Sequence, residues 1–329
     1  MASKTTYVLN SGYKIPALGL GTWQSKLHEV EKAVEVALKA GYRHIDGAAA
    51  YGNETEVGAG VKNSGVPREE IFLTSKLWNT NHRPENVEPA CDKSLRDLGV
   101  KYLDLYLIHW PVAFVPGEGL FPREPETGKM HLDNGVTIKE TWRAMESLVK
   151  KGKVRSIGVS NFTKDKLEDL LSYAEIPPAV NQIEAHPYLQ QPELKQYMEE
   201  KNIHLQAYSP LGNNLKGKPR VVDDPFVQKI ADRYGVSAAR VLIAWAVQRG
   251  TIVLAKSVTP ERIVDNFRDI VLPDSAMEEL NSLERHARGG YPLFWGVDMF
   301  GEEGDAAAKE AARVNGLERL AGVEEMDKS

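Results

Sequence analysis

The chain has 329 residues, of which 42% are hydrophobic and 26% charged, values that are ordinary for a globular protein with a large core. Its formal net charge of -5 gives no basic surplus, so we expect neither nucleic acid nor an anionic membrane as a partner. The single cysteine (Cys91), the lack of an apolar signal segment in Met1–Asn10 and the lack of any apolar run of membrane-spanning length predict a cytoplasmic protein.

The first residues have a pattern that is typical of a β-hairpin. Thr6–Leu9 and Tyr13–Ile15 have the composition of short strands, and Asn10-Ser11-Gly12 between them supplies the residues that hairpin turns favour. After this hairpin, apolar runs of strand length alternate with longer stretches of helical period. The expected strands are Leu18–Thr22, Tyr42–Asp46, Ile71–Lys76, Leu103–His109, Ser156–Ser160, Val180–Glu184, His204–Tyr208 and Ile252–Ser257.

The stretches between these strands have apolar residues at the spacing of amphipathic helices. Thr163 is placed to cap the N-terminus of one helix, and Gly41 and Gly99 stand where glycines commonly end helices. The clearest helices are expected at Glu29–Ala40, Pro84–Leu98, Ile138–Lys150 and Lys164–Ala174.

This alternation predicts an α/β fold, namely a (β/α)8 TIM barrel with an N-terminal β-hairpin and with active-face loops at the C-terminal ends of the strands. The main alternative is an open doubly wound sheet, which normally carries a Gly-x-Gly-x-x-Gly turn after its first strand. Here that position reads Gly19-Leu20-Gly21-Thr22-Trp23-Gln24 and lacks the third glycine, so we favour the barrel. We expect one barrel domain over residues 1–300.

Two segments do not fit the strand–helix alternation. Val112–Gly135 is a long connection with several prolines and glycines, and a loop of this length in a compact domain is usually functional or mobile. Gly301–Ser329 is rich in Ala, Glu and Lys, and we expect a weakly attached tail that is helical or disordered.

Charged residues stand at the ends of three successive apolar strands, where burial is costly unless they are paired. Asp46, Lys76 and His109 occupy these ends, and we favour one shared polar site over separate structural ion pairs. Tyr51 follows Asp46 by five positions, and Lys76 beside it would favour the ionised phenol. Tyr51 could then act as a general acid on a carbonyl that His109 orients. Taken alone, Tyr51 would rather be an aromatic residue that packs on the barrel rim.

The combined motifs are highly specific. Asp46-x4-Tyr51-Gly52-Asn53-Glu54, then Lys76, then Leu107-Ile108-His109-Trp110-Pro111 resembles the aldo-keto reductase superfamily, and the resemblance runs from about Tyr7 to Phe300. It implies an NADPH-dependent reductase of aldehydes and ketones, of the alcohol dehydrogenase (NADP+) or aldehyde reductase type, that acts as a monomer. By this resemblance Asp46, Tyr51, Lys76 and His109 are the catalytic tetrad. Where many relatives have Asp-Thr-Ala or Asp-Cys-Ala, this chain has Asp46-Gly47-Ala48, which predicts a slightly more flexible loop.

The resemblance also implies the NADPH site. Ser160, Asn161 and Gln182 would bind the nicotinamide carboxamide, Tyr208 would stack on the ring, and Ser209-Pro210-Leu211-Gly212 would hold the pyrophosphate. A helix start with adjacent hydroxyl groups suits the adenosine 2′-phosphate, with Lys256 as a point charge and Arg262 as a planar fork; the alternative is an ordinary capped helix. The complete set of expected cofactor residues is Thr22, Trp23, Asp46, Ser160, Asn161, Gln182, Tyr208, Ser209, Leu211, Lys256, Ser257, Val258, Thr259, Arg262, Asp265 and Asn266.

Aromatic residues follow several strand ends and predict an apolar slot for the substrate, although they could also be packing on the rim. The expected substrate residues are Trp23, Trp78, His109 and Trp110. Phe114, Phe121 and the segment Tyr291–Phe300 lie on variable loops that would close over the slot. The segment Tyr291–Phe300 resembles fungal family members that handle glycerol, glyceraldehyde or sugar-derived carbonyls, such as NADP-dependent glycerol dehydrogenases. The physiological substrate is therefore expected to be a small molecule of this kind.

Two other functional classes remain open. Some barrels of this superfamily are regulatory subunits that bind cofactor without turnover, and turnover of a simple aldehyde would exclude that role. A metal-dependent barrel hydrolase would need several ligands on adjacent strands. The histidines show no metal-ligand spacing, so we expect no metal, and we interpret His44 as a satisfied interior histidine because it shares the strand side of Asp46.

Overall fold

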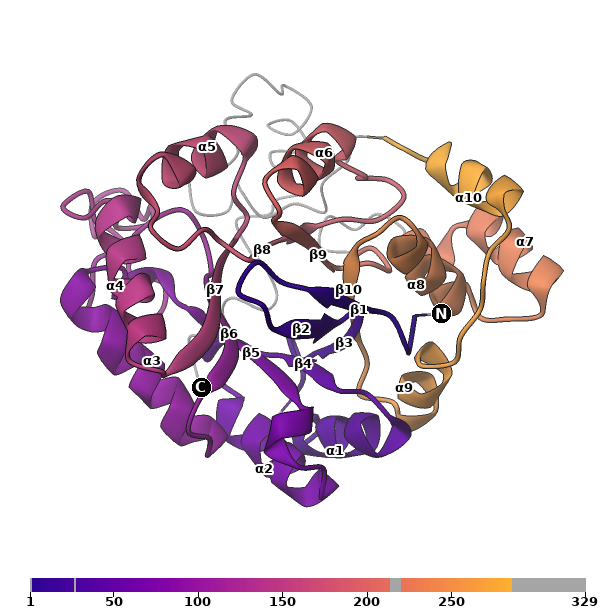
Figure 1. Cartoon of the computed structure of the whole chain (residues 1–329), viewed down its shortest axis with the longest axis horizontal. Coiled ribbons are helices and arrows are strands. Elements are labelled where there is room, and N and C mark those ends of the chain that lie inside the picture. Colours follow the sequence, from indigo (N-terminus) through magenta and orange to yellow (C-terminus); the bar gives the residue numbers. More distant parts are fainter. Residues whose placement is uncertain (1, 27, 214–219, 286–329) are drawn as a thin grey trace.

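Eight parallel strands close into a barrel in this computed structural model, which describes residues 2–26, 28–213 and 220–285 (Figure 1). The order around the barrel is β10-β3-β4-β5-β6-β7-β8-β9, so the last strand pairs with the first and no edge is left. The barrel is confirmed, and the open sheet is wrong. The strands are β3 Leu18–Gly21, β4 His44–Asp46, β5 Phe72–Leu77, β6 Leu103–Ile108, β7 Val154–Ser160, β8 Val180–Glu184, β9 His204–Tyr208 and β10 Ile252–Lys256.

Helices surround the ring of strands on its outside (Figure 1). The main hydrophobic core lies between the two layers and includes the fully buried rings of Trp142 and Trp245. The connection from β9 to β10 contains two helices. The helices are α1 Val30–Ala40, α2 Glu54–Ser64, α3 Pro84–Leu98, α4 Ile138–Lys150, α5 Lys164–Tyr173, α6 Pro192–Glu200, α7 Pro225–Tyr234, α8 Ala238–Gln248, α9 Pro260–Asn266 and α10 Asp274–Asn281.

The helix ends follow the expected local chemistry. Gly41 and Gly99 have φ values of 113° and 66° at the C-termini of α1 and α3, a left-handed conformation that glycine adopts without a steric cost. The Thr163 side chain accepts a hydrogen bond from the Lys166 N–H at the start of α5. Strand β4 begins later than expected because the Tyr42 N–H is bonded to the carbonyl of Ala37 in α1.

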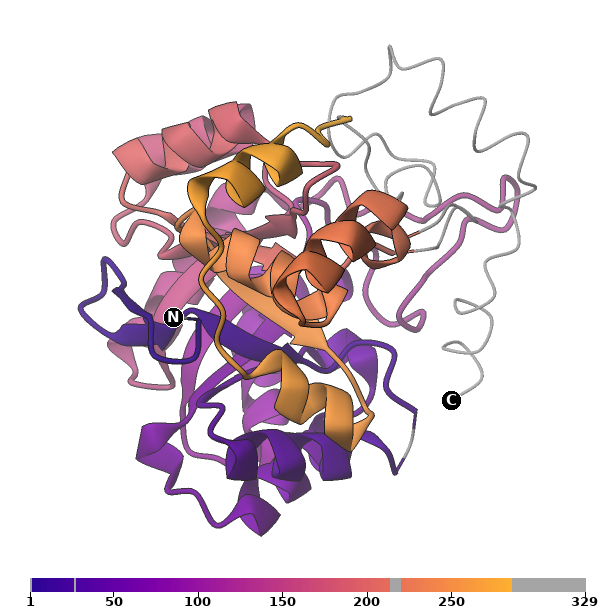
Figure 2. The same ribbon diagram turned by 90° about the vertical axis from the view of Figure 1, so that its right-hand side faces the viewer.

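The N-terminal hairpin closes one end of the barrel. Strands β1 (Thr6–Val8) and β2 (Lys14–Pro16) pair antiparallel, which confirms the predicted hairpin. Leu9 and Ile15 pack on side chains inside the barrel, among them Phe72 and Leu105. In Figure 2 the hairpin and the connection between β6 and α4 lie on opposite sides of the barrel. The hairpin therefore leaves the barrel open only at the C-terminal ends of the strands, and a site inside the barrel must be reached from there.

The other segments are placed as follows. Val112–Gly135 folds back on itself, with antiparallel bridges between Phe114 and Leu132 and between Arg123 and Met130. The segment Tyr291–Phe300 and the tail Gly301–Ser329 lie outside the described residues, so both expectations stay predictions. Within the described ranges, no helix is long and apolar enough to cross a membrane.

Candidate active site

Four side chains meet at the C-terminal end of the barrel, as expected from the strand ends. Asp46 ends β4, Lys76 lies in β5, His109 follows β6, and Tyr51 comes from the short 3-10 helix Ala49–Tyr51 after β4. Asp46 is 2%, Lys76 0% and His109 8% exposed, so these polar groups are almost completely withdrawn from water. A shared site rather than separate ion pairs explains their burial, because each buried charge needs a partner.

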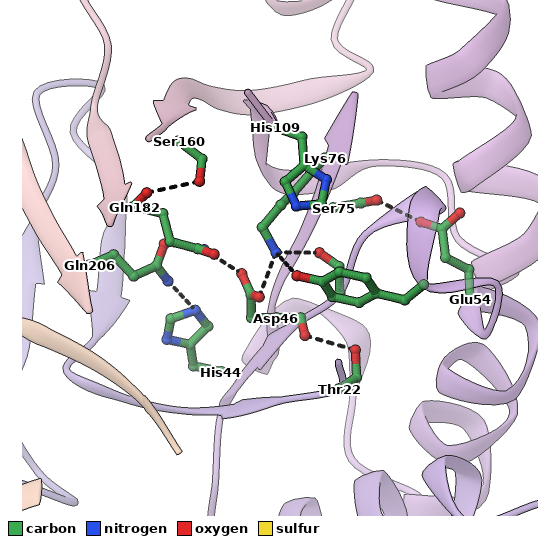
Figure 3. A network of polar contacts seen from close by, with 12 residues as sticks. Thr22, His44, Asp46, Glu54, Ser75, Lys76, His109, Ser160, Gln182 and Gln206 are labelled. Atoms are coloured by element: carbon green, nitrogen blue, oxygen red, sulfur yellow. Dashed lines mark hydrogen bonds and ion pairs between the residues drawn. The ribbon is translucent and has the colours of Figure 1, made fainter. Parts of the chain in front are cut away.

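Lys76 connects this group (Figure 3). Its Nζ lies 2.6 Å from Asp46 Oδ1, 2.8 Å from the Gly47 carbonyl oxygen and 3.2 Å from the Tyr51 hydroxyl. Gly47 does not need to be glycine for its backbone, because a Cβ at this position would meet the Thr74 oxygen at an ordinary 3.5 Å. Its N–H and carbonyl are both hydrogen-bonded, which gives no support to a looser loop.

Tyr51 does not have the lowered pKa that its neighbour Lys76 alone would give. Burial, and after it the negative charge of Asp46, raise the pKa of Tyr51 well above its ordinary value. Lys76 at 3.2 Å favours a phenolate, but burial outweighs this effect, and Asp46 at 2.6 Å from the ammonium balances part of the Lys76 charge. Tyr51 is therefore protonated and can give a proton away.

His109 is a neutral hydrogen-bonding group. Burial, with help from the positive charge of Lys76, lowers the pKa of His109 well below its ordinary value. Its ring lies 5.7 Å from that of Tyr51 and 5.1 Å from that of Trp78, edge to face in both cases. A neutral imidazole and a protonated phenol are both hydrogen-bond donors, and here their rings are neighbours at the C-terminal end of the barrel.

Aromatic side chains form an apolar wall beside His109. The Trp78 ring makes edge contacts with Phe114 and Phe121, and its Nε1–H donates to the Leu120 carbonyl oxygen at 2.7 Å. The loop Val112–Gly135 thus packs against Trp78, one of the expected substrate residues. Trp23 directly follows β3 and is partly exposed. The buried apolar cluster at this end consists of Ala50, Trp78, Trp110, Phe114, Phe121 and Met130.

The residues expected at the nicotinamide lie on adjacent strands β7, β8 and β9. The Ser160 hydroxyl donates to the Gln182 carbonyl oxygen at 2.8 Å, and the Tyr208 hydroxyl donates to Asn161 Oδ1 at 2.8 Å. Gln182 Nε2 donates to Asp46 Oδ2 at 2.8 Å, which joins this group to the tetrad. The Thr22 hydroxyl donates to the Asp46 carbonyl oxygen at 2.9 Å.

The residues expected at the phosphates are more exposed. Lys256 and Arg262 are exposed, and Lys256 Nζ donates to the Gln24 carbonyl oxygen at 3.1 Å. Thr259 donates its N–H to the Ser257 hydroxyl at 3.1 Å, which shapes the start of α9. The remaining expected residues are half-buried Ser209, Leu211, Val258 and Asp265, and buried Asn266. Asp265 accepts a hydrogen bond from Ser237 on the neighbouring chain segment.

Two further polar residues lie near the tetrad, and sequence reasoning missed one of them, Gln206. Gln206 lies inside the barrel against Gln182, and Glu54 accepts hydrogen bonds from the Ser75 and Ser94 hydroxyls. A polar residue at an interior position of an apolar strand was the available signal for Gln206. Glu54 is the last residue of the motif Asp46-x4-Tyr51-Gly52-Asn53-Glu54 and the first residue of α2. Among the described residues, no group of three or more His, Cys, Asp or Glu side chains is placed to hold a metal ion.

Comparisons with known proteins point in one direction. The family model described as the aldo/keto reductase family matches residues 17–285. A D/L-glyceraldehyde reductase of Hypocrea jecorina is 46% identical over 328 residues, which cover 95% of this chain and 99% of that protein. Aldo-keto reductase family 1 member A1 of Homo sapiens is 45% identical over 298 residues, covering 87% and 91%. A solved aldose reductase from Schistosoma japonicum has a TM-score of 0.84 and 41% identity, covering 92% and 99%.

Proposed function

The chain belongs to the aldo/keto reductase family, and we propose that it reduces aldehydes and ketones to alcohols with NADPH as the hydride source. The observation that carries this proposal is the Tyr51 hydroxyl, which lies 3.2 Å from the Lys76 ammonium and faces the His109 ring beside an apolar wall. A protonated phenol next to a buried cation is the arrangement that proton donation to a carbonyl oxygen requires.

Each residue of the tetrad has a separate task. A bound NADPH would supply the hydride that the carbonyl carbon needs. Tyr51 donates its proton to the carbonyl oxygen, so the product is a neutral alcohol and a phenolate remains on the chain. Lys76 stabilises that phenolate through its charge, Asp46 holds Lys76 in place, and neutral His109 orients the carbonyl by a hydrogen bond.

The residues present fit a nicotinamide cofactor. Ser160, Asn161 and Gln182 offer hydroxyl and amide groups from neighbouring strand ends, which match the donors and acceptor of a carboxamide. Asn161 and Ser209 have φ values of 64° and 49°, a left-handed conformation that is uncommon outside glycine and often occurs at ligand sites. Lys256 and Arg262 near the start of α9 support NADPH over NADH, because both are cations that suit a 2′-phosphate.

Small polyol- or sugar-derived carbonyls are the proposed substrate class. The support comes from the similarity to a protein named D/L-glyceraldehyde reductase and from a mouth that combines an apolar wall with polar donors. We also propose a cytoplasmic monomer, because every residue of the proposed site belongs to one barrel. Light scattering of the purified protein measures the oligomeric state.

A substrate panel tests the proposed function. We expect NADPH oxidation with glyceraldehyde and with a simple aromatic aldehyde, and much weaker activity with NADH. A protein that binds NADPH but turns over neither aldehyde would instead be a cofactor-binding relative without catalysis. Binding of neither cofactor would refute the proposal.

A further inference from the structure

From Asp46, polar side chains continue through the interior of the barrel by way of Gln182 and Gln206 to His44 (Figure 3). Gln182 Nε2 donates to Asp46 Oδ2 at 2.8 Å and to Gln206 Oε1 at 3.1 Å. Gln206 Nε2 lies 3.1 Å from His44 Nε2, and His44 Nδ1 lies 3.0 Å from the carbonyl oxygen of Pro16 in β2. None of the three interior side chains is more than 2% exposed.

The contact at the hairpin end of this series, between His44 and the Pro16 carbonyl oxygen, fixes the direction of every hydrogen bond. The Pro16 carbonyl oxygen can only accept, so His44 must carry its proton on Nδ1. Burial lowers the pKa of His44 to about 4, so the ring is neutral near pH 7 and its Nε2 must accept. Gln206 therefore presents Nε2 to His44 and Oε1 to Gln182. Gln182 in turn must present Nε2, a donor, to the Asp46 carboxylate.

The contact at the active-site end, between Gln182 and Asp46, gives the same hydrogen-bond directions independently. An ionised Asp46 can only accept, which again requires Gln182 Nε2 to donate, Gln206 to accept from it, and His44 Nε2 to accept from Gln206. The whole series is thus consistent with one assignment, in which Asp46 is charged and His44 is neutral. Reversing either amide would bring two donors or two acceptors together in a place that water does not reach, which is costly.

We propose that Gln206 and His44 are positioning residues that fix the orientation of the Gln182 amide, with the Pro16 carbonyl of the hairpin as the fixed point. This inference rests on the proposed function in one respect, namely that Gln182 contacts the nicotinamide carboxamide. In the fixed orientation Gln182 Oε1 is the atom that receives a hydrogen bond from the carboxamide NH2. Gln206 and His44 therefore control how well the nicotinamide half of the cofactor is held, without touching it.

Two variants and a matched control test the proposal. Gln206→Met keeps the length of the side chain and removes both of its hydrogen bonds, and His44→Phe removes the acceptor that orients Gln206. Thr74→Val is the control, because Thr74 is also fully buried and lies two positions before Lys76 on β5, and its hydroxyl has no partner among the described residues. Binding of NADPH and of adenosine 2′,5′-bisphosphate, which lacks the nicotinamide half, is measured by fluorescence and calorimetry.

We expect Gln206→Met to weaken NADPH binding about 5- to 30-fold, the effect of one or two lost buried hydrogen bonds. Binding of adenosine 2′,5′-bisphosphate should stay unchanged, and so should both affinities in Thr74→Val. Because the two residues act through one series, the double variant should lose no more than Gln206→Met alone. Equal losses for both ligands, or additive losses in the double variant, would show a merely structural role and overturn the proposal.

A second measurement does not depend on catalysis or on a folded His44→Phe variant. Nitrogen-15 NMR of labelled histidine in the wild-type protein should show His44 as the neutral tautomer with its proton on Nδ1. A proton on Nε2, or a charged ring at pH 7, would overturn the proposed direction of the hydrogen bonds. If the wild-type protein binds no NADPH but His44 has the expected tautomer, the proposed function fails while the orientation of Gln206 and Gln182 stands.

Discussion

At the scale of single residues, the Lys76 ammonium contacts both a carboxylate and a phenol. Asp46 lies 2.6 Å away and Tyr51 3.2 Å away, so the carboxylate balances the lysine charge while the phenol is still protonated. Lys76 therefore stabilises Tyr51 mainly after the phenol has lost its proton, because a second negative charge then lies beside the ammonium. Stabilisation that grows in the transition state is what accelerates a reaction.

Tyr51→Phe removes one oxygen and little volume. We expect the rate of aldehyde reduction to fall about 10²- to 10⁴-fold, the range for a positioned general acid. NADPH affinity should be kept, because Tyr51 is not among the expected cofactor residues, most of which lie in or follow β7 to β10. Steady-state kinetics and NADPH titration measure the two quantities.

Tyr106→Phe is the matched control for the loss of a tyrosine hydroxyl. Tyr106 is fully buried on β6, and its hydroxyl has no partner among the described residues. Its variant should reduce aldehydes at the wild-type rate. A folded Tyr51→Phe protein that reduces an aldehyde at a near wild-type rate would show that another group donates the proton.

At the scale of elements, most residues expected at the cofactor and most residues of the apolar wall come from different strands of the barrel. The expected nicotinamide and phosphate residues follow or lie in β7 to β10, whereas the apolar wall comes mainly from the segments after β5 and β6. The connection from β6 to α4 is attached to the segment after β5, because Phe114 donates its N–H to the Asn79 carbonyl oxygen at 2.9 Å. Substitutions in the two regions should therefore have separable effects.

Removal of the Arg262 side chain tests the phosphate end. Arg262→Ala should weaken NADPH binding by about 1.5–3 kcal/mol, the usual contribution of a hydrogen bond to a charged group. NADH lacks the 2′-phosphate, so its affinity should change little. Arg96→Ala, at an exposed arginine in α3, is the control. Equal losses for NADPH and NADH in Arg262→Ala would contradict the assignment of α9 to the phosphate.

The loop Val112–Gly135 is expected to set the range of substrates. Phe121→Ala removes a ring that lies 5.4 Å from Trp78, so the KM values for small and large aldehydes should change in rank. NADPH affinity should remain at the wild-type value. If NADPH affinity falls and the ranking of aldehydes is kept, this loop belongs to the cofactor rather than to the substrate.

At the scale of the whole molecule, folding leaves several histidines buried without charge. Burial lowers the pKa of His44 to about 4 and that of His82 to about 3. In the unfolded chain these histidines take up protons near pH 6.5, the ordinary pKa of histidine. Below that pH the folded state therefore binds fewer protons than the unfolded state. The contribution of these neutral histidines to the free energy of unfolding is thus fully present above about pH 6.5 and is lost as the pH falls towards 4.

We therefore expect the unfolding free energy to fall by about 1.4 kcal/mol per pH unit for each such histidine, or about 3 kcal/mol for His44 over its window. His82→Leu should flatten this dependence, because both ring nitrogens of His82 are buried without a partner among the described residues. Chemical unfolding between pH 7 and pH 4 measures the slope.

His28→Gln serves as the control for the removal of a histidine, since the His28 side chain is 93% exposed. The same slope in His82→Leu and in the wild type would mean that buried neutral imidazole is not the cause of the acid sensitivity.

The sequence by itself determined the barrel, the hairpin and the position of the tetrad. Alternating apolar runs and helical periods depend only on local spacing, and charged residues at apolar strand ends are visible without coordinates. Asp46, Lys76 and His109 could be placed at one end of the barrel because parallel strands bring their C-terminal ends together. The caps at Gly41 and Thr163 were equally local.

Only the tertiary structure decided which polar groups are partners and how much water they lose. Gln206 and His44 lie 162 positions apart, and their contact exists because β9 and β4 line the same closed interior. The direction of the Tyr51 pKa shift was predicted wrongly for the same reason. The number of nearby charges can be guessed from sequence, but desolvation depends on the packing of the whole barrel around the group.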